Sequence, residues 1–193
     1  DVDFTLEEST CDDLTCPTTL SFNTGLQHGQ IIGNSVSQPF SSFGITITSG
    51  DASNHPLVIF DSARPQGEFT TDLDLGTPNE EFGGPGVGNG GTSGEPGVND
   101  VAFGNLIIIN ENSDSSNGFV NEADDFAGGG DIYFQFSPSR TIYGVTYIDS
   151  DGGETGSFVR LTDSSQNEIV KRSIPALGNN ARVTVPFNGG NGF

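Results

Sequence analysis

Short stretches in which apolar and polar residues alternate recur along the chain, and they constrain the fold more than any other feature. The stretches contain Leu20 and Phe22, then Phe43, Ile45 and Ile47, then residues 57–60, 105–110, 131–136, 141–149, 157–163, 167–174 and 181–187. A two-residue period is typical of β-strands. Clusters of Asn, Asp, Gly, Ser and Pro separate the stretches, and no long amphipathic helix is indicated. We predict an all-β fold, an antiparallel β-sandwich of jelly-roll type.

The length of 193 residues fits one large domain. We expect residues 1–17 to form an N-terminal arm or edge strand with a small disulfide loop, and residues 18–193 to form a single β-sandwich domain. Two segments interrupt the strands. Residues 83–104 contain nine Gly and predict a long loop, and residues 110–131 are acidic and rich in turn-forming residues.

The charge of the chain is strongly negative, with a formal net charge of −20. Between Pro65 and Ser139 there are 13 Asp or Glu residues and no Lys or Arg. Such a surface repels nucleic acids and anionic membranes, which argues against both as partners. Nor is there an apolar run of 18 residues, so we expect no membrane insertion.

Several features favour an exported protein. The chain has no Met and begins at Asp1, as expected of an extracellular protein after removal of a signal peptide. Cys11 and Cys16 are close in sequence and have no neighbouring His, which favours a disulfide over a zinc site. The alternative is a pair of reduced thiols.

Acidic residues gather where predicted strands end, and oxygen-rich loops of this kind suit Ca²⁺. One set follows the apolar run at 57–60, and a second lies in the acidic segment. In the first set, we expect Asp72 and Asp74 to point to one side of an extended chain, with Leu73 facing the core. The two sets comprise Asp61, Asp72 and Asp74, and Asp124, Asp125 and Asp131. The alternative is that these are solvated carboxylates in turns.

A third acidic set, Asp149, Asp151 and Glu154, superficially resembles the start of an EF-hand. The sequence DSDGGE lacks the further ligands and the flanking helices of that motif, so we reject the EF-hand. The same residues suit a β-hairpin turn, and we leave both the ion site and the turn open.

Nothing in the sequence favours catalysis. The motifs of serine hydrolases, zinc proteases and phosphate-binding loops are missing. His28 and His55 are isolated and fit surface or turn positions better than a catalytic base or a ligand. A carbohydrate-binding module is the alternative function, for which stacking rings would come from Tyr133, Tyr143, Tyr147, Phe82 and Phe119 unless these rings lie in the core.

A resemblance to a known module rests on four stretches of sequence. They are FDSARPQGEFTTDLDLGTPNEEFGGPGVGNGG, NDVAFGNLIIINE, ADDFAGGGDIYFQFSPSRTIYGVTYIDSD and IPALGNNARVTV. Together they resemble a module of secreted proteins from aquatic bacteria, some with a PEP-CTERM-type sorting signal and others long multidomain surface proteins. The similarity extends over most of residues 18–187.

The resemblance implies an exported, cation-stabilised β-sandwich in the extracellular matrix or at the cell surface, without enzymatic activity. It adds Asn105 and Glu111 to the candidate metal ligands, because they occupy recurrent polar positions of the module. Asp61, Asp72, Asp74, Asp124 and Asp125 occupy the others.

The C-terminus departs from the pattern, since similar modules continue into another apolar strand after the stretch corresponding to RVTVPFNGGNG. A sandwich without its last strand exposes a sheet edge. Val2, Phe4 and Leu6 alternate with polar residues, and we expect them to add a strand to a neighbouring copy and build a head-to-tail filament. The alternatives are pairing within their own domain, or a chain that is a fragment.

These observations together predict a secreted, non-enzymatic, calcium-stabilised β-sandwich with a structural or adhesive role. Its expected partners are other copies of itself or an extracellular polysaccharide.

Overall fold

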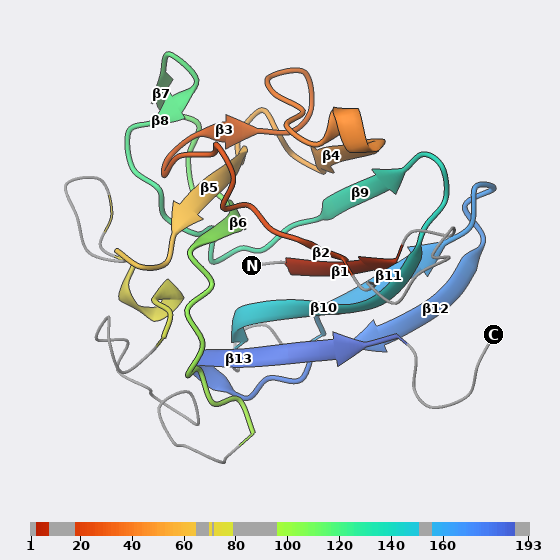
Figure 1. The fold of residues 1–193 in the computed structure, drawn as a ribbon. Coiled ribbons are helices and arrows are strands. Elements are labelled where there is room, and N and C mark those ends of the chain that lie inside the picture. Colours follow the sequence, from red (N-terminus) through yellow and green to blue (C-terminus); the bar gives the residue numbers. More distant parts are fainter. Residues whose placement is uncertain are drawn as a thin grey trace.

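The computed structural model describes residues 3–7, 18–64, 70, 72–78, 96–150 and 156–187, and these are mostly β-structure (Figure 1). Two short 3₁₀ turns, η1 (Ser41–Phe43) and η2 (Leu73–Leu75), accompany the strands. The strands are β1 (Asp3–Glu7), β2 (Thr18–Leu20), β3 (Ile31–Ile32), β4 (Ile45–Ser49), β5 (Leu57–Asp61), β6 (Asn105–Ile109), β7 (Ser115–Ser116), β8 (Phe119–Val120), β9 (Ile132–Phe136), β10 (Thr141–Ser150), β11 (Phe158–Thr162), β12 (Glu168–Ser173) and β13 (Gly178–Pro186).

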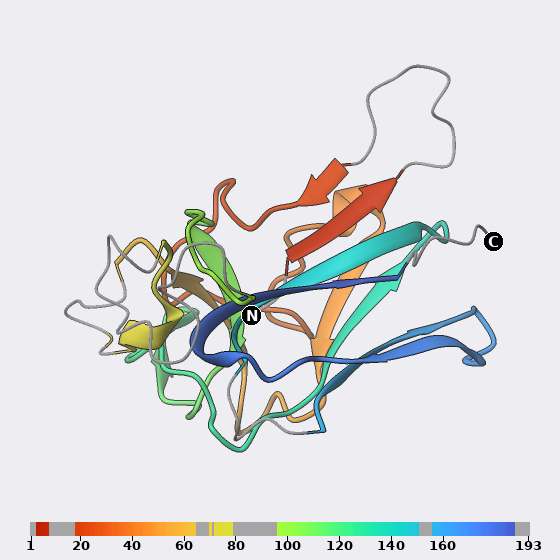
Figure 2. The ribbon, with the colours of Figure 1, turned by 90° about the horizontal axis from the view of Figure 1, so that it is seen from below.

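The pairing of these strands confirms the prediction of an all-β, antiparallel fold. One sheet has the order β13-β10-β1-β2 and another the order β3-β5-β6. The pairs β4-β9, β7-β8 and β11-β12 complete the set, and each ladder in the described residues is antiparallel. Figure 2 shows the β11-β12 hairpin extending away from the loops around β7 and β8.

Strand β5 is buried on both faces, which explains its four consecutive apolar residues. Leu57 and Ile59 point into one apolar cluster, whereas Val58 and Phe60 point into a second. All four side chains are fully buried. Because side chains alternate along a strand, a run without polar residues is what a strand between two cores requires.

The larger of the two clusters joins most of the sheets. Besides residues of β5, it contains Ile45 and Ile47 of β4 and Ile142 and Val145 of β10. Partly buried side chains from β9, β11 and β12 pack against it. The smaller cluster includes Leu75, which follows the acidic residues of the first predicted set.

The backbone of β1 lies inside its own sheet, between β10 and β2. Residues 3–7 are paired with residues 141–146, and residues 4–6 also with residues 18–20. This is the arrangement in which the N-terminal strand pairs within its own domain, and it makes β1 an interior strand rather than an edge. Val2, Cys11 and Cys16 lie outside the described residues, so the disulfide stays a prediction.

Two predictions for the turn that carries Asp72 are wrong. Residues Leu73–Leu75 form the 3₁₀ turn η2 rather than extended chain, and Leu75 instead of Leu73 is the buried residue. A 3₁₀ turn satisfies its backbone through bonds between residues three apart, so the two-residue alternation does not apply.

Candidate metal site

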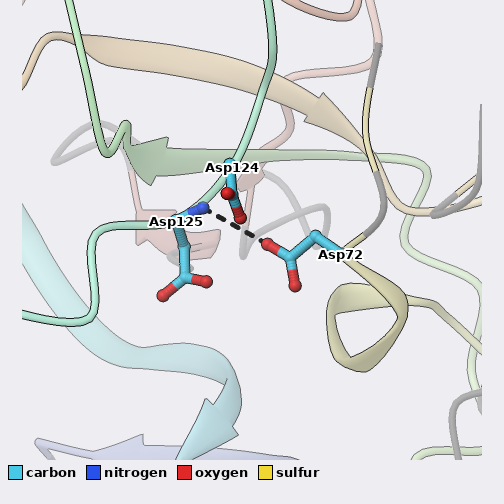
Figure 3. Close-up of side chains that lie close together, drawn as sticks. All are labelled: Asp72, Asp124 and Asp125. Carbon is cyan, nitrogen blue, oxygen red and sulfur yellow. Dashed lines mark hydrogen bonds between the residues drawn. The ribbon is translucent and has the colours of Figure 1, made fainter. Parts of the chain in front are cut away.

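Three carboxyl groups from two separate loops come together beside η2. One oxygen each of Asp72, Asp124 and Asp125 lies within 4.8 Å of the others. Figure 3 shows Asp72 reaching toward the backbone of Asp125, whose N–H donates to Asp72 Oδ2 at 3.3 Å. These three residues were all predicted as metal ligands, and the structure places members of both acidic sets at one point.

Asn110 fixes the loop that carries Asp124 and Asp125. This residue directly follows β6, and its side chain is fully buried. The amide Nδ2 donates to the carbonyls of Asn112 at 3.0 Å and Glu122 at 3.1 Å, and Oδ1 accepts the Asp124 N–H at 3.0 Å. One side chain therefore closes both ends of the acidic segment onto the end of β6.

A second pair of buried amides holds the turn that carries Asp72. Asn180 of β13 donates from Nδ2 to the carbonyls of Asp74 and Gly76, and its Oδ1 accepts from Asn99 Nδ2 at 3.1 Å. Asn99 Nδ2 also donates to the Gly76 carbonyl at 3.0 Å. Both amides are buried, so this turn is fastened to β13 by bonds that water does not replace.

The electrostatics of the cluster oppose full ionisation. The pKa of Asp72 is raised to about 10, first by burial, then by a hydrogen bond with the Asp74 side chain and by the charges of Asp125 and Asp74. Only 8% of Asp72 is exposed. The pKa of Asp124 is also raised, first by burial and then by the charge of Glu111. A divalent cation bound at the cluster would compensate the negative charge and so lower the pKa values of both groups.

The donor atoms are those that Ca²⁺ prefers. The three carboxylates supply only hard oxygen ligands, and no His or Cys joins them within the described residues. Asp74 and Glu111, both predicted ligands, lie beside the cluster, since each influences the pKa of a cluster member. Ca²⁺ takes 6–8 oxygen ligands, so carbonyl groups and water would complete its shell.

Asp61 and Asn105 are not brought to this cluster. They form a pair at one end of the β5-β6 ladder, whereas Asn110 follows the opposite end. Asp61 forms an ion pair with Arg64 at 2.8 Å. Asn105 Nδ2 donates to the carbonyls of Phe22 at 3.0 Å and Leu26 at 3.1 Å, which fixes the strand start rather than an ion.

Asp131 and Asp149 are likewise not among the three carboxylates of the cluster. Asp131 accepts the Tyr133 hydroxyl at 3.1 Å at the end of the β4-β9 ladder. Asp149 Oδ1 accepts the Asn180 N–H at 2.6 Å. Asp151 and Glu154 lie outside the described residues.

Sequence reasoning missed the three buried amides, Asn99, Asn110 and Asn180. Polar residues at the ends of predicted strands look like ordinary turn residues, and burial of such a residue depends on the loops that fold over it. The one available signal was the Asn that ends the apolar run NLIIIN, where a buried amide can cap a buried strand.

Both His residues have structural contacts. His55 stacks on Phe126 with ring centroids 3.6 Å apart, and its Nδ1 lies 3.2 Å from the Asn110 carbonyl. His28 Nδ1 accepts the Asp61 N–H at 3.0 Å. Both rings are partly buried, whereas the sequence predicted surface or turn positions.

Comparisons with known proteins add no relative, because no family model, no curated protein and no solved structure matches the chain. The resemblance to the secreted bacterial module therefore stays a prediction. Among the described residues, no helix has the length and apolar character needed to cross a bilayer.

Proposed function

We propose that this protein is an exported, non-catalytic β-sandwich of jelly-roll type that binds Ca²⁺ and has a structural or adhesive role at the cell surface or in the extracellular matrix. The observation that carries the proposal is the convergence of Asp72, Asp124 and Asp125 from two loops. The sandwich is supported by antiparallel sheets that pack on shared apolar clusters. Export and the extracellular role follow from the resemblance to secreted modules.

The role of the ion is to hold two acidic loops together. Three nearby carboxyl groups, one of them almost fully buried, repel one another when ionised. Calcium that binds the folded chain but not the unfolded chain stabilises the fold. The gain is about 2.7 kcal/mol when free Ca²⁺ is at 100 times its dissociation constant. Extracellular sites bind Ca²⁺ in the range of about 0.1–1 mM, where the ion is abundant.

Thermal unfolding in Ca²⁺, in Mg²⁺ and in EDTA tests this proposal, with Asp72→Asn as the decisive variant. Without the ion, Asp72 is protonated near neutral pH, because its pKa is about 10. Asn has the shape of a protonated Asp, so we expect Asp72→Asn to melt like the wild type in EDTA. The same variant should lose most of the Ca²⁺-dependent rise in Tm.

Asp131→Asn is the matched control, because it removes an exposed carboxylate away from the cluster. It should keep the full response to Ca²⁺. A wild type whose Tm is unchanged by Ca²⁺, or equal responses in the two variants, would show that the cluster binds no calcium.

A carbohydrate-binding module is the second candidate, and the exposure of Tyr133 favours it. This ring is 50% exposed on β9, whereas burial places Tyr147 largely inside the protein and raises its pKa. Binding to a glycan array that Tyr133→Ala abolishes would support this function. An array without signal for the wild type would exclude it for the glycans displayed.

Self-association through β1 is a further part of the proposal, and in this fold it means strand exchange. The strand would leave β10 and β2 of its own chain and pair in the same way with a second copy. Refolding from denaturant at high and at low concentration tests it. Oligomers that form only on refolding at high protein concentration would support strand exchange. Monomers at both concentrations would refute it.

A further inference from the structure

The hairpin β11-β12 presents an outer face that combines apolar and basic side chains. On its inner side, Val159, Leu161 and Val170 pack against the larger apolar cluster. On the outer side, Phe158 is 42% and Ile169 is 61% exposed. Exposed aromatic and aliphatic residues next to cations are common at protein interfaces.

Two cations face each other on this outer face. Arg160 is directly opposite Lys171 in the antiparallel ladder. The Lys171 Nζ lies 3.5 Å from the centroid of the Phe158 ring, where a cation–π contact holds it. With Arg172, the hairpin carries three of the six basic residues of a chain that has 26 carboxylates.

Within the described residues, no carboxylate forms an ion pair with Arg160 or Lys171. Like charges directly opposite each other destabilise a sheet. The ion pairs found between two described residues include Arg64 with Asp61 and Arg182 with Asp100. An acidic partner bound to this face would offset the repulsion, and local conflicts of this kind often mark functional surfaces.

We propose that the outer face of β11-β12 docks onto the acidic loop of a second copy of this chain. That loop exposes Glu111, Asp114 and Glu122. Figures 1 and 2 place the hairpin and the loops around β7 and β8 on opposite sides of the molecule. Two complementary surfaces on opposite sides form a heterologous contact, which extends into an open chain of molecules instead of a closed dimer.

A second copy suits this face better than an extended polyanion. The face is small, with two opposed cations flanked by Phe158 and Ile169, and it lies on a molecule with a net charge of −20. A long anionic polymer would extend beyond the hairpin onto the negatively charged surface around it, which repels it. A compact acidic loop is short enough to contact the two cations alone. The inference rests on the structural role proposed above, but not on the calcium site.

Sedimentation velocity at low salt tests the docking, with each variant's fold checked by its circular dichroism and Tm. Arg160→Glu with Lys171→Glu should weaken self-association at least tenfold, and so should Asp114→Lys with Glu122→Lys. Mixing the two double variants should restore it, because each supplies the charge that the other lacks.

The single variant Lys171→Glu is compared with Arg64→Glu, which changes the net charge equally at an exposed cation outside the hairpin. Equal effects of these two variants, a wild type that is monomeric at low salt, or a mixture that stays monomeric would each overturn the proposal. A monomer that binds pectate through Arg160 and Lys171 would also overturn it, in favour of a polysaccharide. Loss of calcium-dependent melting alone would leave it intact, so the two proposals fail separately.

Discussion

Replacement of Asn180 should destabilise the protein more than any surface change. The expected loss of unfolding free energy follows from the hydrogen bonds of this one side chain. The side chain makes three hydrogen bonds, to the carbonyls of Asp74 and Gly76 and to Asn99. At about 1 kcal/mol each, their loss removes about 3 kcal/mol. The backbone of Asn180 has a φ of 60°, in the left-handed region, which costs Ala about 1 kcal/mol more. We therefore expect Asn180→Ala to lose about 4 kcal/mol.

Asn180→Gly separates the two contributions. Glycine also lacks the three bonds but adopts a positive φ easily, so it should be about 1 kcal/mol more stable than the alanine variant. Urea unfolding of the three proteins in EDTA measures both differences, because calcium binding then makes no contribution. The expected loss for alanine corresponds to a fall in Tm of about 10 °C. Losses below about 1 kcal/mol in both variants would show that the amide network contributes little, and equal losses would refute the backbone argument.

The remaining predictions concern Gly44 and His28. A Cβ at Gly44, where φ is 73°, would overlap the Ser137 carbonyl, so Gly44→Ala should cost more than about 2 kcal/mol in urea unfolding. Gly118→Ala, at a φ of 83° with open space around it, should cost only about 1 kcal/mol, and equal costs would contradict the overlap. Burial lowers the pKa of His28, against the charge of Asp61, so the folded state resists its protonation. Stability from this ring is complete above pH 6.5 and is lost as the pH falls below it; His28→Asn should flatten this loss, and an identical pH profile of Tm would contradict the assignment.

The strands were predictable because their cause is local. In stretches such as ITITS and IYFQF, each side chain's polarity reports which face of the strand is covered, and β4 and β9 were found where the alternation occurs. The pairing of β1 with β10 was not predictable, because it joins residues far apart in the sequence and no local pattern encodes a partner.

The type of site could be predicted from the sequence, but the residues that form it could not. Clustered Asp residues at strand ends indicated cation binding, and Asp72, Asp124 and Asp125 do meet. Asp61 looked equivalent in the sequence, but Arg64, three residues later, pairs with it instead. Which carboxylates converge depends on how Asn110 folds a loop back on β6, and this is a tertiary property.

Strand β5 also sets how the molecule comes apart. It is hydrogen-bonded to β3 and β6, and each of its faces belongs to a different apolar cluster. Neither cluster can open while this strand stays in place, so its amide protons should exchange with solvent only when the whole domain unfolds. The exchange rate of the amides of residues 57–60 therefore measures global unfolding. Faster exchange at the acidic loops or in the β11-β12 hairpin then reports local opening of those regions.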